Sequence, residues 1–378
     1  MNEPAMNPSE GGRLPASLRG WLAARLTRRS TVAPANGKKA VIFKLDRLGD
    51  FVLALGAIRL LVRHYGEEEC VLLISPHAAE LAAAEFPRTQ RLVLPAEGSG
   101  VLREWWPLRR GHRAFFDGTG YGTLVNLRHW LSPHHRVVLA WIKARAACTL
   151  GRLPENGADP FAGGHELAAE YPREPAGPLS RELLAHQRVV SAALGRPVGA
   201  EEVRPSFASV TPARGDYLLV CPFSSAALRD YPAEQLAAAL REFLADADCR
   251  VVFSGTAAQR PALARLAARV GAPRTELSAD ATTLGFVQRV AGARGVLTGE
   301  SAAAHIATAL DKPAVILLGG GHAGMFGPWG DGRRQRWLTH PLPCFGCDWR
   351  CIFPETRCLT QIEPARVAQA LRETFAAG

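Results

Sequence analysis

The sequence predicts an α/β protein of two doubly wound domains that face each other across a cleft. Three observations lead to this prediction. With 378 residues, the chain is too long for one ordinary hydrophobic core. Short apolar runs alternate with helix-length segments, as in parallel sheets built from right-handed βαβ units. The alternation stops at a Pro-containing linker near residues 195–215 and then starts again.

The first half of the chain supplies five expected strands and four expected helices. Its strands are continuous apolar runs, which suit a parallel sheet covered on both faces. A Gly- and Pro-rich stretch, 151–178, is interpreted as a long irregular loop, and loops of that length are usually functional. The strands are expected at 40–44, 71–75, 91–94, 124–127 and 147–150, and the helices at 51–64, 78–85, 134–142 and 179–194.

The second half repeats the pattern after the linker. We expect a tail at residues 1–36, a first domain at 37–200, a second domain at 210–362 and a final segment at 363–378. The strands are expected at 217–221, 250–254, 295–298 and 314–318, and the helices at 232–245, 260–270, 282–291, 303–310 and 364–375.

Composition and charge limit the class of protein. The chain is 47% hydrophobic and 21% charged, which is ordinary for a globular protein. It contains no run of about 18 uncharged apolar residues and begins without the apolar core of a signal peptide, so we expect a cytoplasmic protein without a spanning helix. The net charge of +10 fits an anionic substrate, nucleic acid or an anionic membrane.

Residues 13–29 carry leucines and a tryptophan at helical spacing among arginines. This pattern resembles a basic amphipathic helix that lies on a membrane surface. It equally describes a tail helix that packs on the domain, or a disordered tail. Peripheral contact with the cytoplasmic face of an inner membrane is therefore one of the open expectations.

The most informative segment is the first strand and the loop that follows it. Asp46, Arg47 and Asp50 follow the buried strand 40–44, at the edge where ligands bind in open α/β sheets. A carboxylate there, at the start of a helix, is either a helix cap or a catalyst. Arg47 and Arg128 lie in the first half and are candidates to receive an acidic or phosphorylated acceptor, the alternative being solvated surface.

Two loops of the second half are candidate anion sites. Residues 221–232 leave a strand with Ser224, Ser225 and Arg229, which offer hydroxyl donors and a cation. Residues 297–305 leave another strand and begin a helix whose free N–H groups favour an anion. In this second loop, Glu300 is expected to accept hydrogen bonds from sugar hydroxyls, and the others to lie near the same ligand: Ser301, Ala302 and His305.

Four of the eight cysteines cluster near the C-terminus. Cys344, Cys347, Cys351 and Cys358 could hold a structural zinc or iron ion, although their spacing departs from paired C-x2-C ribbons. The alternative is a cysteine-rich loop that stays reduced. A site with four protein ligands would be structural and not catalytic.

Four segments, spread over most of the chain, resemble glycosyltransferase family 9, the ADP-heptose:lipopolysaccharide heptosyltransferases and their relatives. They are KLDRLGD at 44–50, CPFSSAALRDYP at 221–232, GESAAAH at 299–305 and the PCFGCDWRC tail. The resemblance departs from the family at three points in the second half. Arg229 stands where the family usually has Lys, Glu300-Ser301-Ala302 replaces D-[ST]-G, and GGGH at 319–322 replaces G-P-T-D.

The resemblance implies a GT-B fold, with an acceptor domain first and a nucleotide-sugar domain second, and a last helix that crosses back to brace the first domain. It implies that Asp50 is the base of an inverting, single-displacement sugar transfer. Arg229, Ser224, Ser225 and the N–H groups after Glu300 would stabilise the leaving diphosphate without a catalytic metal. The implied partners are an ADP-heptose-like donor and a glycolipid or oligosaccharide acceptor of the lipopolysaccharide-core type.

Two other classes stay open on the sequence. The departures in the second half fit a family-like protein that binds a nucleotide or a partner without catalysis. The cysteine cluster and the net charge fit a zinc-ribbon nucleic-acid binder, but two nucleotide-type domains argue against that class, and we expect no nucleic-acid partner. Retention of both Asp50 and Arg229 favours the enzyme.

Overall fold

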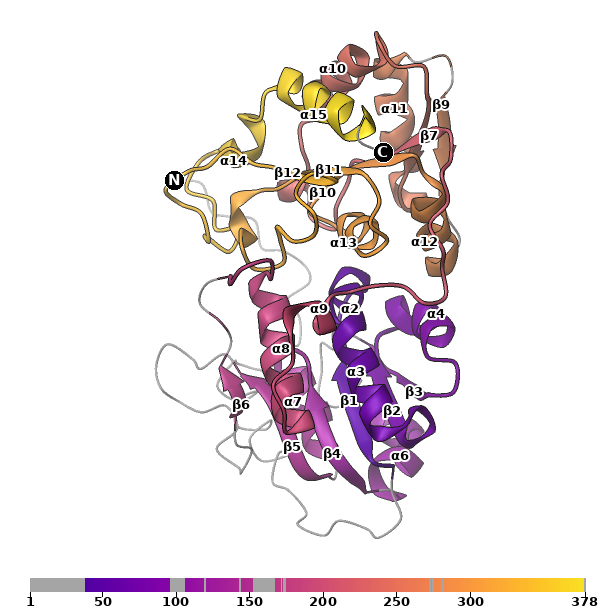
Figure 1. Cartoon of the computed structure of the whole chain (residues 1–378), viewed down its shortest axis with the longest axis vertical. Coiled ribbons are helices and arrows are strands. Elements are labelled where there is room, and N and C mark those ends of the chain that lie inside the picture. The colour runs from indigo at the N-terminus through magenta and orange to yellow at the C-terminus, as the bar shows by residue number, and fades with distance from the viewer. Residues whose placement is uncertain are drawn as a thin grey trace, which may run out of the picture.

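The computed structural model describes residues 38–95, 106–118, 120–142, 144–151, 167–170, 172, 175–271, 273, 275–279 and 282–376. Two six-stranded parallel sheets form the centres of two domains stacked end to end (Figure 1). The predicted amphipathic segment 13–29 lies outside the described residues. Among the described helices, none combines the length and apolar character that a membrane crossing requires.

The first sheet has the strand order β3-β2-β1-β4-β5-β6, with every neighbouring pair parallel. Helices α3, α4 and α8 pack on one of its faces together with α2, and α6 and α7 on the other. The strands are Ala40–Lys44 (β1), Cys70–Ile74 (β2), Gln90–Val93 (β3), Tyr121–Asn126 (β4), Ala144–Gly151 (β5) and Leu167–Glu170 (β6). The helices are Leu48–Leu53 (α2), Leu55–Tyr65 (α3), Pro76–Glu85 (α4), Trp106–Gly111 (α5), Arg113–Gly118 (α6), Pro133–Trp141 (α7), Arg181–Leu194 (α8) and Ala200–Val203 (α9).

The second sheet has the equivalent order β12-β11-β10-β7-β8-β9. Its strands are Tyr217–Cys221 (β7), Arg250–Ser254 (β8), Thr275–Ser278 (β9), Gly295–Gly299 (β10), Ala314–Leu317 (β11) and Gln335–Leu338 (β12). Its helices are Ala233–Leu244 (α10), Arg260–Val270 (α11), Thr283–Gly292 (α12), Ala302–Ala309 (α13), Arg357–Thr360 (α14) and Pro364–Ala376 (α15). Both orders are the Rossmann order of two mononucleotide-binding halves.

Side chains alternate along the central strands and feed separate cores. Val41 and Phe43 of β1 point to the cluster that α6 and α7 cover, whereas Ala40 and Ile42 point to the opposite cluster. That opposite cluster is continuous across both domains, because α2 packs on α13 and α4 packs on α12. The two domains therefore share a buried apolar contact.

Three sequence-based expectations need correction. Residues 167–170, expected to lie in the irregular loop 151–178, form strand β6 at the edge of the first sheet. The expected helix at 51–64 is two helices, α2 and α3, which meet at Ala54, and α2 already begins at Leu48. The last helix, α15, does not brace the first domain. It packs on α10 and on β10, β11 and β12 of the second domain, because its apolar stripe fits there and Gly295 leaves space for the Phe375 ring.

The connector between the domains is anchored at both ends. On the first domain, the buried Glu85 carboxylate accepts hydrogen bonds from the N–H groups of Ala208 and Ser209 at 2.9 Å. On the second domain, Nζ of Lys312 donates to the carbonyl oxygen of Ala213 at 2.7 Å. Residues 210–212 lie between these anchors.

Candidate active site

The strand orders bring four loops together between the domains. In each sheet the order reverses at its centre, between β1 and β4 and between β7 and β10. Ligands of open α/β sheets bind outside the carboxyl ends of the strands at such reversal points. The loops that follow these four strands carry most of the predicted site residues, and the two sheets direct them toward one another (Figure 1).

The start of α2 packs directly on the start of α13. A methyl group built on Gly49 would lie 3.4 Å from Cα of Ala302 and 3.2 Å from Cδ2 of His305. Ser301, the N-cap of α13, exchanges a hydrogen bond with the Thr298 hydroxyl at 3.0 Å. The small residues at the start of α13 therefore allow α2 of the first domain to approach closely.

Asp50 lies in the first turn of α2 and does not cap the helix. The N-cap is Arg47, and no side-chain cap hydrogen bond is formed. Asp50 is half-buried, and its carboxylate has no hydrogen bond or ion pair with any described residue. Burial raises the pKa of Asp50, and the positive charge of Lys44 offsets part of that rise. Such a carboxylate suits a general base.

Beneath Asp50 lies a buried charge network that the sequence did not reveal. Nζ of Lys44 lies 3.0 Å from Oε1 of Glu182 and 3.1 Å from Oδ2 of Asp46. Nδ1 of His129 lies 2.6 Å from Oε2 of Glu182. Burial alone would raise the pKa of Glu182, but His129 and Lys44 hold this pKa well below its usual value. The network therefore keeps a fixed anion, Glu182, behind Asp50.

Arg128 lies in this network rather than on open surface. Its guanidinium pairs with Asp46 and donates to the carbonyl oxygens of Leu45, at 2.6 Å, and Trp130, at 2.7 Å. Burial lowers the pKa of Arg128 to about 10. The structure thus gives Arg128 internal partners where the sequence suggested an acceptor ligand.

Arg47 and Arg229, which come from different domains, meet on a single hydroxyl group. Nη1 of Arg47 and Nη2 of Arg229 each donate a hydrogen bond to Oγ of Ser225 at 2.6 Å. Arg47 comes from the first domain, and the other two residues follow β7 in the second. Ser224, in contrast, uses its hydroxyl locally: Oγ donates to the carbonyl oxygen of Ala226 at 2.7 Å. Ser224 therefore shapes the loop that presents Arg229.

Glu300 follows β10 and is 5% exposed. Both of its carboxylate oxygens are buried without a hydrogen-bond partner. Burial raises the pKa of Glu300 to about 7, while Arg229 lowers this pKa and Asp50 raises it further. Glu300 thus lies near both predicted catalytic groups, with two acceptor atoms unused.

His305 lies inside the second domain, one turn into α13. Its Nδ1 accepts a hydrogen bond from the indole N–H of Trp329 at 3.2 Å, and the two rings stack at an interplanar angle of 15°. Burial lowers the pKa of His305 to about 4, so the ring is neutral at physiological pH. The structure shows a packing role for His305, and its contact with Trp329 joins α13 to the loop after β11.

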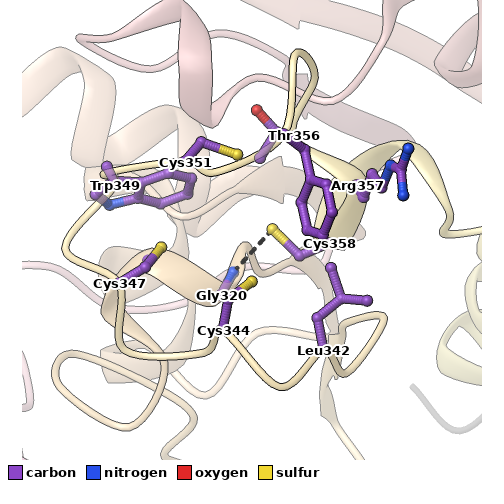
Figure 2. Close-up of a pocket in the computed structure, with 11 residues that line it drawn as sticks. Gly320, Leu342, Cys344, Cys347, Trp349, Cys351, Thr356, Arg357 and Cys358 are labelled. Atoms are coloured by element: carbon purple, nitrogen blue, oxygen red, sulfur yellow. Dashed lines mark hydrogen bonds between the residues drawn. The ribbon is translucent and has the colours of Figure 1, made fainter.

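The four clustered cysteines line one pocket, with their side chains around it (Figure 2). Sγ of Cys358 accepts a hydrogen bond from the N–H of Gly320 at 3.2 Å. Four thiols are a suitable donor set for zinc or iron. However, no three His, Cys, Asp or Glu side chains within the described ranges converge closely enough to hold a metal ion. The donor chemistry fits an ion, and the present spacing of the thiols does not.

The cysteine loop also explains the GGGH segment. Methyl groups built on Gly319 and Gly321 would lie 2.3 and 2.4 Å from the Trp349 ring, and one on Gly320 would lie 2.5 Å from the Phe345 ring. The N–H of Asp348 donates to the carbonyl oxygen of Gly321 at 3.1 Å. The three glycines are therefore the surface on which the cysteine loop packs.

Known proteins resemble this chain in two ways: some match part of its sequence, and others share its fold. Residues 187–351 match the model of glycosyltransferase family 9 (heptosyltransferase). Lipopolysaccharide heptosyltransferase 1 of Pseudomonas aeruginosa is 30% identical over 132 residues, which cover 31% of this chain and 36% of that relative. The matched stretch thus spans about a third of the curated relative.

Solved structures extend the similarity to nearly the whole chain. Escherichia coli heptosyltransferase WaaC with ADP aligns with a TM-score of 0.63 and 17% identity over 89% of this chain and 99% of its own. A family 9 glycosyl transferase from Veillonella parvula aligns with a TM-score of 0.64 and 14% identity over 92% of this chain and 100% of its own. The iron-containing dodecameric glycosyltransferase TibC of E. coli aligns with a TM-score of 0.55 and 12% identity over 92% of this chain and 78% of its own. The chain therefore has the GT-B fold of these neighbours, and residues 187–351 are similar to glycosyltransferase family 9.

Proposed function

We propose that the protein transfers a heptose or a related sugar from a nucleotide-diphosphate sugar to a lipopolysaccharide-core-type acceptor, with inversion at the sugar. The observation that carries the proposal is the position of Asp50. It is an unpaired carboxylate with a raised pKa, and it faces a second-domain site that holds Arg229 and the start of α13. A base on one domain and an anion site on the other are what a direct displacement requires.

The proposed roles follow the geometry. Asp50 removes the proton from the attacking acceptor hydroxyl as the C–O bond to the sugar forms. Arg229 and the N–H groups at the start of α13 stabilise the diphosphate that leaves with the bonding electron pair. Glu300 accepts hydrogen bonds from hydroxyl groups of the donor, which would satisfy its two unused oxygens. These fixed charges perform the transfer without a catalytic metal ion.

The donor is proposed to be ADP-heptose-like. Similar proteins support this choice: one is named a lipopolysaccharide heptosyltransferase, and WaaC is described in complex with ADP. The acceptor would then be a glycolipid or an oligosaccharide, reached in the cytoplasm or at the cytoplasmic face of the inner membrane.

A structural metal ion in the cysteine pocket is a separate part of the proposal. Cys344, Cys347, Cys351 and Cys358 would hold a zinc or iron ion, which would fix the loop that packs on the three glycines. TibC, which shares the fold, is described as iron-containing. The thiols must move closer together to bind an ion, since no three of them converge closely enough within the described residues.

The competing proposal is a nucleotide-binding protein without catalysis. Its main support is the set of departures at Glu300, Ala302 and GGGH, and packing of the cysteine loop supplies a structural cause for the last of these. Turnover decides between the two. We expect a thermal-shift panel of nucleoside diphosphates and nucleotide sugars to identify the donor, and that donor to be consumed in the presence of a core-oligosaccharide acceptor. Stabilisation by a donor without any turnover would favour the non-catalytic protein.

A further inference from the structure

Two guanidinium groups from different domains converge on one neutral oxygen. Arg47 and Arg229 both donate to Ser225 Oγ. The distance between their donor nitrogens therefore cannot exceed the sum of the two hydrogen-bond lengths, each of which is 2.6 Å. Like charges this close repel, and a hydroxyl group offsets little of that repulsion. The arrangement is that of an anion site, in which a phosphate oxygen would bridge both cations.

The second-domain half of this site has unused positive charge. Arg229 forms no ion pair with a carboxylate in the described part of the chain. A methyl group on Gly299 would lie 3.6 Å from the Arg229 carbonyl oxygen, so the loop after β7 packs at the end of β10. Arg229 therefore lies beside the first turn of α13, whose N–H groups also favour an anion.

The first-domain half places Arg47 at the same position from the other side. Arg47 is exposed and directly precedes α2, whose Gly49 contacts Ala302 and so fixes this loop against the second domain. The charge of Arg47 also lowers the pKa of Asp50, which shows that it lies near the proposed base. Arg47 thus stands between the base and the second-domain anion site.

We propose that Arg47 is a ligand of the donor's diphosphate, supplied across the cleft by the acceptor domain. The inference rests on the proposed function, namely that the second domain binds a nucleotide-diphosphate sugar. A phosphate oxygen takes the position between the guanidinium groups that Ser225 Oγ now marks. The diphosphate site is then complete only when the domains meet, as they do where α2 packs on α13. Arg47 therefore binds the donor, whereas the sequence assigned it to the acceptor.

The test is calorimetric titration of the full chain with ADP, UDP, GDP and inorganic pyrophosphate. The variants are Arg47→Gln and the matched control Arg63→Gln, because Arg63 is an exposed arginine of α3 without a hydrogen bond or ion pair to a described residue. We expect Arg47→Gln to weaken pyrophosphate and the preferred diphosphate about tenfold or more, as loss of a charge-assisted bond does. Arg63→Gln should bind like the wild type.

The outcomes separate this inference from the proposed function. If the wild type binds a diphosphate and Arg47→Gln binds it as tightly as Arg63→Gln does, Arg47 is not a diphosphate ligand and the inference fails alone. If the wild type binds none of the four probes, the nucleotide-sugar proposal fails and takes the inference with it.

Discussion

Glu300→Gln should change how the stability of the ligand-free protein depends on pH. Glu300 is 5% exposed, both oxygens lack partners, and burial raises its pKa from 4.5 to about 7. Between those pH values the folded protein keeps a proton that the unfolded chain releases. Stability therefore falls as pH rises through this window, and the loss is complete above the folded-state pKa.

The magnitude follows from the width of the window. Each pH unit inside it costs the folded state about 1.36 kcal/mol, so the full loss is about 3 kcal/mol. The residue is almost fully buried, so solvent screens little of this cost. Glutamine has nearly the same shape and no charge, so Glu300→Gln should gain about 2–3 kcal/mol relative to the wild type between pH 5 and pH 8.

Urea denaturation at pH 5 and pH 8 measures this difference. Glu68→Gln is the control, because the Glu68 side chain is 71% exposed and its ion pair with Arg88 is 3.9 Å long. This control should keep the same difference from the wild type at both pH values, within about 0.5 kcal/mol. A pH-independent difference for Glu300→Gln would refute the reasoning, because it would mean that the folded protein holds Glu300 ionised and paired.

Three further predictions concern the base, the glycine surface and the cysteine pocket. Asp50→Ala should lower sugar-transfer turnover about 10²–10⁴-fold while diphosphate affinity in calorimetry is kept; full turnover would exclude Asp50 as the base. In the wild type, the raised pKa of Asp50 should make the rate fall as pH decreases and the base is protonated. Gly320→Ala should lose about 1–3 kcal/mol in urea denaturation, since its methyl group would lie 2.5 Å from Phe345, whereas Gly332→Ala, with open space, should be neutral. Elemental analysis should find zinc or iron in the wild type and a loss of it in Cys358→Ser; equal metal content in both would contradict the site.

The fold was largely predictable because the central strands are strongly apolar. Strands such as β1 and β7 are buried along almost their whole length and carry an unambiguous signal. The strands that sequence reasoning missed, β6, β9 and β12, all lie at or next to solvent as edges of their sheets. These three edge strands are short, and polar residues such as those in QRWL of β12 weaken the apolar pattern that would identify them.

The candidate site could be proposed from the sequence where one loop carries its residues. Asp50 and Arg229 were proposed from the residues around them, and their roles stay predictions. Glu182 was not, because it acts through Lys44 and His129, which are distant in sequence and meet it only in the folded protein. The sequence also did not reveal the ion-pair partner of Arg128. Arg128 looks like a free cation in the sequence, but in the structure it pairs with Asp46.

The placement of α15 has a mechanical consequence. Since α15 stays on the second domain, the described chain passes from one sheet to the other once, through residues 210–212. The anchors at Ser209 and Ala213 immobilise both ends of this span, and the Pro212 ring fixes one of its torsions. Any change in the angle between the domains would therefore turn about this one short segment of the described chain. Because residues 210–212 contain none of the candidate site residues, we expect a substitution there to alter the domain angle without changing any group of the candidate site.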